Sequence, residues 1–86
     1  MKWTVDWINE TDDELTEIWL RDSDRAAITS AAYRIEHELQ NGPDQKGEDF
    51  YGDRIYRYGP LAVAYELIHD DRLVRIIQVM RLKEKH

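Results

Sequence analysis

The stretch RYGPLAVAYELIHDDRLVRIIQVMRL, residues 57–82, reads as two apolar segments separated by a polar turn. Apolar residues dominate positions 61–68 and 73–80, and Asp70-Asp71 lies between them. With these aspartates as the central residues of a tight hairpin turn, the numbers of antiparallel partners sum to 141. The predicted pairs are Glu66 with Arg75, Ala64 with Ile77, and Ala62 with Val79. The stretch therefore predicts two adjacent antiparallel strands.

This register gives the hairpin one nearly continuous apolar face, formed by Leu61, Val63, Tyr65, Leu67, Val74, Ile76, Gln78 and Met80. The other face carries Ala62, Ala64, Glu66, Arg75, Ile77, Val79 and Arg81. A preceding strand, roughly 51–58, turns at Gly59-Pro60 and brings Arg57 opposite Ala62. Arg57 and Arg81 are then expected near one another, in a shallow basic depression on this second face.

The N-terminal residues predict a strand followed by a helix. Trp3, Val5 and Trp7 alternate with polar residues, which is typical of a strand with one buried face. Thr11 and Glu14 have the spacing of a capping box, so a helix is expected over about 12–21. Leu15, Ile18 and Trp19 lie on one face of that helix. The three tryptophans are expected in the core, with the alternative that one of them forms part of a groove that receives a partner protein.

A second helix is expected after Ser23 or Asp24, either of which can cap it. Its apolar stripe consists of Ala27, Ile28, Ala31, Ile35 and Leu39. Asn41-Gly42-Pro43 ends the helix, because glycine favours the left-handed conformation there and proline prevents continuation. The stretch NGPDQKGED, residues 41–49, is expected to form a polar loop. The sequence thus predicts an α+β fold of order β-α-α-β-β-β, with two N-terminal helices on one face of a small, mostly antiparallel sheet.

Length and composition indicate one soluble domain spanning residues 1–86. A chain of 86 residues with 42% hydrophobic and 35% charged side chains can bury one modest core. The absence of cysteine excludes disulfides and thiolate metal sites, which fits a reducing compartment. The sequence has no apolar run of membrane-spanning length and no signal-peptide core, so a cytoplasmic location is expected.

Charge is distributed unevenly along the chain. Residues 1–49 hold 5 basic and 13 acidic side chains, a balance of −8, whereas residues 50–86 hold 7 and 5, a balance of +2. Phosphate contacts supply most of the affinity of nucleic-acid binders, so a net charge of −6 argues against tight nucleic-acid binding. Only the C-terminal part of the chain could bind a polyanion.

The order of elements, the helix stretch ITSAAYRIEHELQNGP at 28–43 and the strands YGPLAVAYELIHDDRLVRIIQVMR at 58–81 together resemble the RelE/ParE toxin superfamily. Members of this superfamily are also called plasmid-stabilisation proteins. The resemblance implies a bacterial type II toxin, held inactive by a cognate antitoxin that wraps its helices and sheet. RelE-like members cleave mRNA in the ribosome, whereas ParE-like members inhibit DNA gyrase.

The resemblance also implies site residues. Cleaving members position the scissile phosphate with basic residues on the open sheet face, and a Tyr, Lys or His nearby transfers a proton. An arginine that they commonly carry in the middle strand is replaced here by Ala62, which leaves Arg57 and Arg81 as catalytic candidates. Tyr58, or His86 near the C-terminus, would transfer the proton. Arg54 and Lys83 are expected to contact RNA or another target, and no metal or small-molecule cofactor is implied.

Simpler roles stay open for several residues. Arg75 can be the cross-strand ion-pair partner of Glu66, and Arg54 can be solvated or locally paired. The run His69-Asp70-Asp71 lies on a hairpin turn, where adjacent side chains diverge, so a metal site is not expected. The acidic stretch 10–24 is either the solvent face of a helix or a surface that attracts a basic partner.

Three functions are compatible with the sequence. The chain is a ribosome-dependent, metal-independent endoribonuclease that acts as an mRNA interferase, or an inhibitor of a target such as DNA gyrase. The third alternative is a non-toxic relative that acts only as a protein-binding module. Replacing Arg57 and Arg81 by alanine distinguishes the first function, since only the nuclease requires both guanidinium groups.

Overall fold

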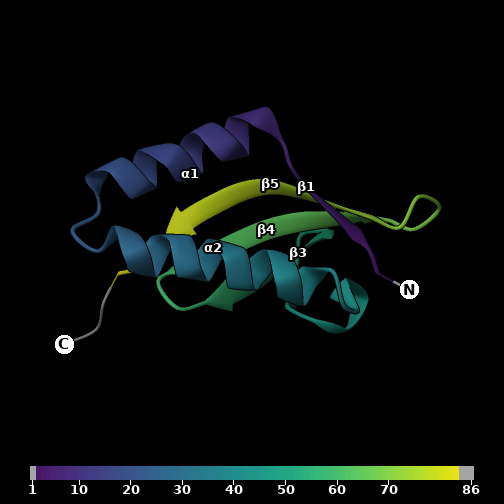
Figure 1. Cartoon of the computed structure of the whole chain (residues 1–86). Coiled ribbons are helices and arrows are strands. Elements are labelled where there is room, and N and C mark those ends of the chain that lie inside the picture. The colour runs from purple at the N-terminus through teal and green to yellow at the C-terminus, as the bar shows by residue number, and fades with distance from the viewer. Residues whose placement is uncertain (1, 84–86) are drawn as a thin grey trace.

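The computed structural model describes residues 2–83 and has two helices packed on one face of a five-stranded sheet (Figure 1). Its elements are β1 (Thr4–Trp7), α1 (Asn9–Arg21), α2 (Arg25–Leu39), a short 3₁₀ helix η1 (Pro43–Gln45), β2 (Glu48–Phe50), β3 (Asp53–Tyr58), β4 (Leu61–Ile68) and β5 (Leu73–Arg81). The strand order is β1-β5-β4-β3-β2, with β1 parallel to β5 and the other pairs antiparallel. The predicted α+β architecture is confirmed, with one strand more than expected.

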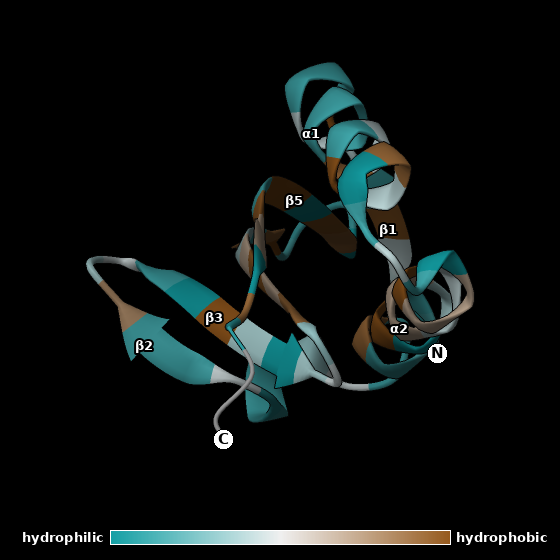
Figure 2. Cartoon of the chain, turned by 90° about the vertical axis from the view of Figure 1, so that its left-hand side faces the viewer, coloured by the Kyte–Doolittle hydropathy of each residue, from teal (hydrophilic) through white to brown (hydrophobic). Residues whose placement is uncertain are grey.

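The additional strand, β2, lies in a segment that the sequence predicts to be a polar loop. All three of its residues are exposed, so it has no alternation of apolar and polar side chains for a pattern to detect. Tyr51, expected to open the next strand, instead lies in the turn between β2 and β3. The two strands form a hairpin that projects away from α1 and α2 (Figure 2).

The core lies between the helices and the helix-facing side of the sheet. It consists of Trp3, Ile28, Ala31, Ile35, Leu39, Leu61, Val63, Tyr65, Val74, Ile76 and Val79. The predicted apolar stripe of α2 supplies four of these residues, and Asp24 caps that helix by accepting a hydrogen bond from the amide of Ala27 at 3.1 Å. Among residues 2–83, no helix is long and apolar enough to cross a membrane.

Helix α1 begins earlier than the sequence predicts. The amide of Asp12 donates to the carbonyl of Ile8 at 2.9 Å, so the helix opens at Asn9 and not at Asp12. Thr11 continues the inward stripe that includes Leu15 and is fully buried. The predicted capping box is therefore wrong, because a side chain turned toward the core cannot cap the helix start. Trp19, predicted to be core, is 37% exposed on the same helix.

A β-bulge changes the register of the central hairpin. The turn at Asp70-Asp71 and the pair Glu66–Arg75 agree with the prediction, but the pairing shifts between Ala64 and Tyr65. Beyond the shift Ala62 faces Met80 and Ala64 faces Gln78, so the predicted pairs with Val79 and Ile77 are wrong. The bulge inserts one residue into β5, which reverses the faces of all residues that follow it. Val79 is consequently buried in the core.

Candidate functional site

The bulge separates the two predicted catalytic arginines. Arg57 pairs with Ala62 as predicted and lies exposed on the sheet face opposite the helices. Arg81 pairs with Leu61, a core residue, and so lies on the helix-facing side. The predicted proximity of these two guanidinium groups is wrong, and the basic depression expected on the open face does not form.

Arg81 has an internal partner. Its Nε donates to Oδ2 of Asp22 at 2.6 Å, and its guanidinium also donates to the carbonyl of Leu82. The Arg81 hydrogen bond lowers the pKa of Asp22, as does the hydrogen bond that the amide of Asp24 donates to this carboxylate at 2.9 Å. The ion pair between Arg81 and Asp22 thereby joins the α1–α2 connection to the end of β5.

The other predicted site residues lie in different places. Tyr58 pairs with Leu61 and so lies on the helix-facing side, with the guanidinium of Arg34 6.0 Å from its ring centroid. Lys83 follows β5 and lines a cavity of about 360 Å³ with Asp24, Gly59 and Arg81 among its walls. His86 lies outside the described residues.

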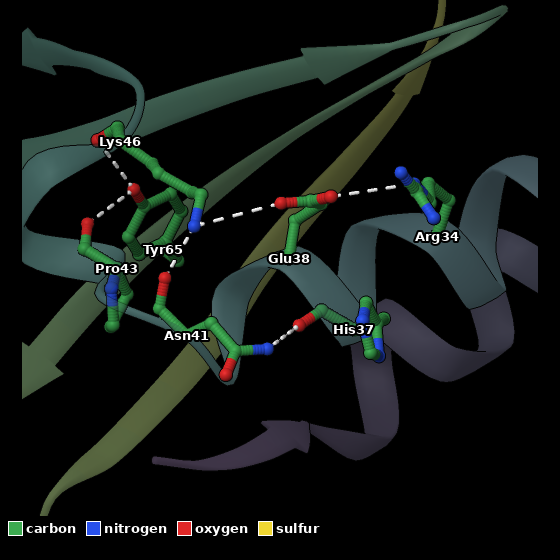
Figure 3. Close-up of polar contacts among 7 residues, drawn as sticks. All are labelled: Arg34, His37, Glu38, Asn41, Pro43, Lys46 and Tyr65. Atoms are coloured by element: carbon green, nitrogen blue, oxygen red, sulfur yellow. Dashed lines mark hydrogen bonds and ion pairs between the residues drawn. The ribbon is translucent and has the colours of Figure 1, made fainter. Parts of the chain in front are cut away.

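Arg54 anchors a loop instead of facing outward. Its Nε donates to the carbonyl of Lys46 at 2.8 Å and its guanidinium also donates to the carbonyl of Gly47 at 3.2 Å. The hydroxyl of Tyr65 lies 2.8 Å from the same Lys46 carbonyl and 2.9 Å from that of Pro43 (Figure 3). Arg54 therefore belongs to the contacts that hold the connection between α2 and β2.

Two more basic residues, Arg34 and Lys46, form ion pairs with Glu38 near the end of α2 (Figure 3). Glu38 lies 3.3 Å from Arg34 and 3.6 Å from Lys46. Lys46 also donates to the carbonyl of Asn41, whose side-chain amide donates to the carbonyl of His37 at 2.9 Å. Several of the chain's cations are thus committed to internal contacts.

The open face of the sheet carries charges of both signs. Arg75 pairs with Glu66 at 3.0 Å, as the sequence predicts. Two carboxylates lie near Arg75 and Arg57 in the sheet: Asp6 is the register partner of Arg75, and Glu48 is the register partner of Ile55, two positions before Arg57 on the same strand. Ala62 and Ala64, between them, are buried. Within residues 2–83 this face offers no concentration of positive charge to hold a phosphate backbone.

An apolar concave surface lies between α1 and α2, and we call it the interhelical groove. It comprises two adjoining cavities of about 230 and 270 Å³ that share Leu15 and Ala32. Its further walls are Thr16, Trp19, Ile28 and Thr29 in the first cavity and Trp7, Asp12, Tyr33 and Glu36 in the second. Trp19 is fixed in it by a 3.0 Å hydrogen bond to Thr29 and by the guanidinium of Arg25 at 4.6 Å from its ring.

The groove has an acidic rim with ordered polar groups. The indole Nε1 of Trp7 donates to Glu36 at 2.9 Å, and Asp12 lies at the same end. Apolar pockets with few, well-placed polar groups are typical of binding sites. The sequence left open whether a tryptophan lies in the core or in a groove, and Trp19 lines the groove. The exposed Tyr33 was not predicted, because its spacing on the helix is equally compatible with burial.

No protein-family model matches the sequence, and no curated protein matches it either. Solved structures match over nearly the whole chain. The toxin–antitoxin complex RelBE2 of Mycobacterium tuberculosis aligns with a TM-score of 0.77 at 19% identity, covering 94% of this chain and 99% of that chain. The chromosomal ParDE system of P. aeruginosa gives 0.66 at 15%, covering 95% and 98%.

A double mutant of the E. coli toxin RelE in the free state gives a TM-score of 0.67 at 15% identity, covering 94% of this chain and 84% of that chain. At these identities the likeness establishes the fold. The chain has the fold of the RelE/ParE toxins, as the sequence resemblance predicts.

Proposed function

We propose that the chain is the toxin of a type II toxin–antitoxin pair and that it acts by contact with a protein target. The observation that carries the choice of mechanism is the separation of Arg57 from Arg81 onto opposite faces of the sheet. The similarity to RelBE and ParDE structures along nearly the whole chain supports the toxin role.

Cleavage of mRNA at this sheet would need positive groups that converge on one phosphate. A single preorganised group that stabilises transition-state charge typically contributes about 3–4 kcal/mol, and its loss lowers the rate by about two to three orders of magnitude. Here Ala62 occupies the position where the resemblance implies an arginine, and the charge of Arg81 is paired with Asp22. Of the two candidate arginines, Arg57 lies exposed on the open face, and Arg75 on the same face is paired with Glu66, so the arrangement favours a mechanism without phosphate chemistry.

The interhelical groove is the surface that we assign to the antitoxin. It presents exposed apolar side chains between two helices, and an amphipathic helix of a partner can bury them. The carboxylates of Asp12 and Glu36 at its rim favour a partner segment that carries lysine or arginine beside its apolar residues.

The test is inducible expression of this chain alone in a bacterial host. Growth, bulk translation and plasmid supercoiling are followed together, since DNA gyrase is the protein target implied by the ParE-like members. We expect growth to stop while translation continues and supercoiling changes. A fall in translation before growth slows would contradict the proposed mechanism, and normal growth with abundant folded protein would contradict the toxin role itself.

Arg57→Ala is the variant that separates the two mechanisms. Because Arg57 makes no ion pair among residues 2–83, this change leaves the fold intact, unlike a change at Arg81. We expect unchanged growth arrest at the same level of induction. A nuclease that depends on this guanidinium would instead lose its toxicity, with reporter mRNA remaining uncut.

A further inference from the structure

The β2–β3 hairpin ends in two exposed aromatic side chains, which we call the aromatic tip. Tyr51 is 94% exposed and Phe50 is 42% exposed. Their rings pack edge to face, with centroids 4.9 Å apart and planes at 73°. The hairpin carries this pair away from the helices, and so away from the interhelical groove (Figure 2).

Tyr51 occupies a backbone conformation that disfavours tyrosine. Phe50 pairs with Asp53, so Tyr51 and Gly52 form a two-residue turn, with φ angles of 50° and 91°. Such a turn requires positive φ at both positions, and asparagine followed by glycine is the preferred sequence. A non-glycine residue there is strained, and strain of this kind concentrates at functional sites.

Tyr51 contributes little to the stability of the folded chain. Its side chain is almost completely exposed, so it buries little apolar area against the rest of the protein. An exposed aromatic residue on a strained turn thus lowers stability without supporting the core. Exposed aromatic side chains are, however, the kind that supply much of the binding energy in protein interfaces.

The charge around the aromatic tip restricts what it can contact. Residues 48–53 contain three acidic side chains and no basic one, a balance of −3. The neighbouring Arg54 directs its guanidinium to the carbonyls of Lys46 and Gly47 and, among residues 2–83, makes no ion pair with these carboxylates. Nucleic acid and anionic lipid are therefore repelled. A second copy of this chain is disfavoured as well, because its interhelical groove has an acidic rim.

We infer that the aromatic tip is the surface through which this toxin contacts its protein target, and that it inserts into an apolar pocket rimmed by lysine or arginine side chains. The inference rests on the proposed function, since it names the part of the chain that reaches the target. It also separates the target contact from the antitoxin surface, because the β2–β3 hairpin projects away from α1 and α2, which form the interhelical groove (Figure 2).

The test compares growth arrest by the wild-type chain with that by Tyr51→Asn. Asparagine is preferred at this turn position, so the variant should unfold at the same temperature as the wild type or a few degrees higher. Loss of an aromatic contact at the centre of an interface should raise the inducer dose for half-maximal arrest by roughly tenfold or more. Arg72→Asn is the matched control, because Arg72 has a φ of 48° in the β4–β5 turn.

A second pair of variants tests the charge of the pocket rim. Asp49→Lys should weaken growth arrest, whereas Asp70→Lys makes the same charge change on the other hairpin and should leave it unaltered. Equal weakening by both variants would overturn the inference, since it would indicate only an effect of net charge.

The outcomes separate the inference from the proposed function. Full growth arrest by Tyr51→Asn overturns the inference and leaves the proposed function intact. A wild-type chain that does not arrest growth overturns the proposed function and the inference with it. Binding of the wild type to phosphatidylcholine vesicles, lost in Tyr51→Asn, would assign the aromatic tip to a lipid surface and also overturn the inference.

Discussion

Tyr65 is a polar residue among the core-facing side chains of β4, where its neighbours Leu61 and Val63 are aliphatic. Tyr65 is fully buried, and its hydroxyl lies within hydrogen-bonding distance of the carbonyls of Pro43 and Lys46. Burial raises the pKa of Tyr65 above its ordinary value of 10.0, and this outweighs the opposing effect of Arg54. One side chain thus joins the core of the sheet to the loop that precedes the β2–β3 hairpin.

Tyr65→Phe should lower the free energy of unfolding at neutral pH by about 0.5–1.5 kcal/mol, because the loop loses the hydrogen bond donated by the hydroxyl. The loss is limited because the Pro43 carbonyl still accepts from the amide of Lys46 and the Lys46 carbonyl from Nε of Arg54. The folded protein holds the phenolic proton more tightly than the unfolded chain, so the wild type should lose stability as pH rises above 10 through the folded pKa. The variant should lose less over that range in urea titrations. An identical alkaline decline in both proteins would contradict this prediction.

Burial likewise raises the pKa of Tyr56, so the alkaline decline should not disappear completely in Tyr65→Phe. Tyr56→Phe is the control, since it removes a raised pKa without removing a donor from the Pro43 and Lys46 carbonyls.

The β2–β3 hairpin depends on close approach between its preceding loop and β3. Gly47 has a φ of +73°, and a Cβ atom there would lie 2.5 Å from the carbonyl oxygen of Ile55 and 3.0 Å from the hydroxyl of Tyr65. Backbone atoms cannot move aside as a flexible side chain can. The position of the hairpin relative to β4 is therefore set by a glycine as well as by the hydrogen bonds of Arg54 and Tyr65.

Gly47→Ala should lower the free energy of unfolding by at least about 2 kcal/mol, from backbone strain and the clash together. Gly42→Ala is the matched control, because Gly42 has a φ of +74° and no atom within 4 Å of the added Cβ. The control should cost about 1 kcal/mol from backbone strain alone. Equal losses in the two variants, measured by urea denaturation, would show that the close approach has no energetic effect.

Across the whole molecule, the helical layer is joined to the end of the sheet by Asp22 and Arg81. These residues are far apart in the sequence, and their 2.6 Å contact connects the α1–α2 loop with the last residue of β5. The helices otherwise meet the sheet mainly through apolar side chains. The bulge places Arg81 on this side of the sheet, and the contact pairs its charge, so the interaction bears on both stability and mechanism.

The Arg81 contact lowers the pKa of Asp22 from its ordinary value of 3.8, so its contribution to stability is present above about pH 4 and is lost as pH falls through the folded pKa. Asp22→Asn should therefore lower the unfolding temperature at neutral pH and make it less dependent on pH in the acid range. Asp70→Asn, in an exposed turn, should change neither quantity. An acid profile of Asp22→Asn that parallels the wild type would contradict this account.

The sequence by itself determined the order of elements other than β2, the apolar stripe of α2, the turn at Asp70-Asp71 and the pairing of Arg57 with Ala62, because each follows from local periodicity or turn chemistry. The Ile76-Ile77 doublet followed by Gln78 was a signal for the bulge, since the simple register placed a glutamine in the core. Only the tertiary structure decided that Arg81 faces the helices, that Thr11 turns inward and that Tyr65 holds a distant loop. These are relations between segments remote in sequence. A one-residue offset between two strands leaves the apolar pattern within each strand unchanged, but it reverses the face on which every later side chain lies.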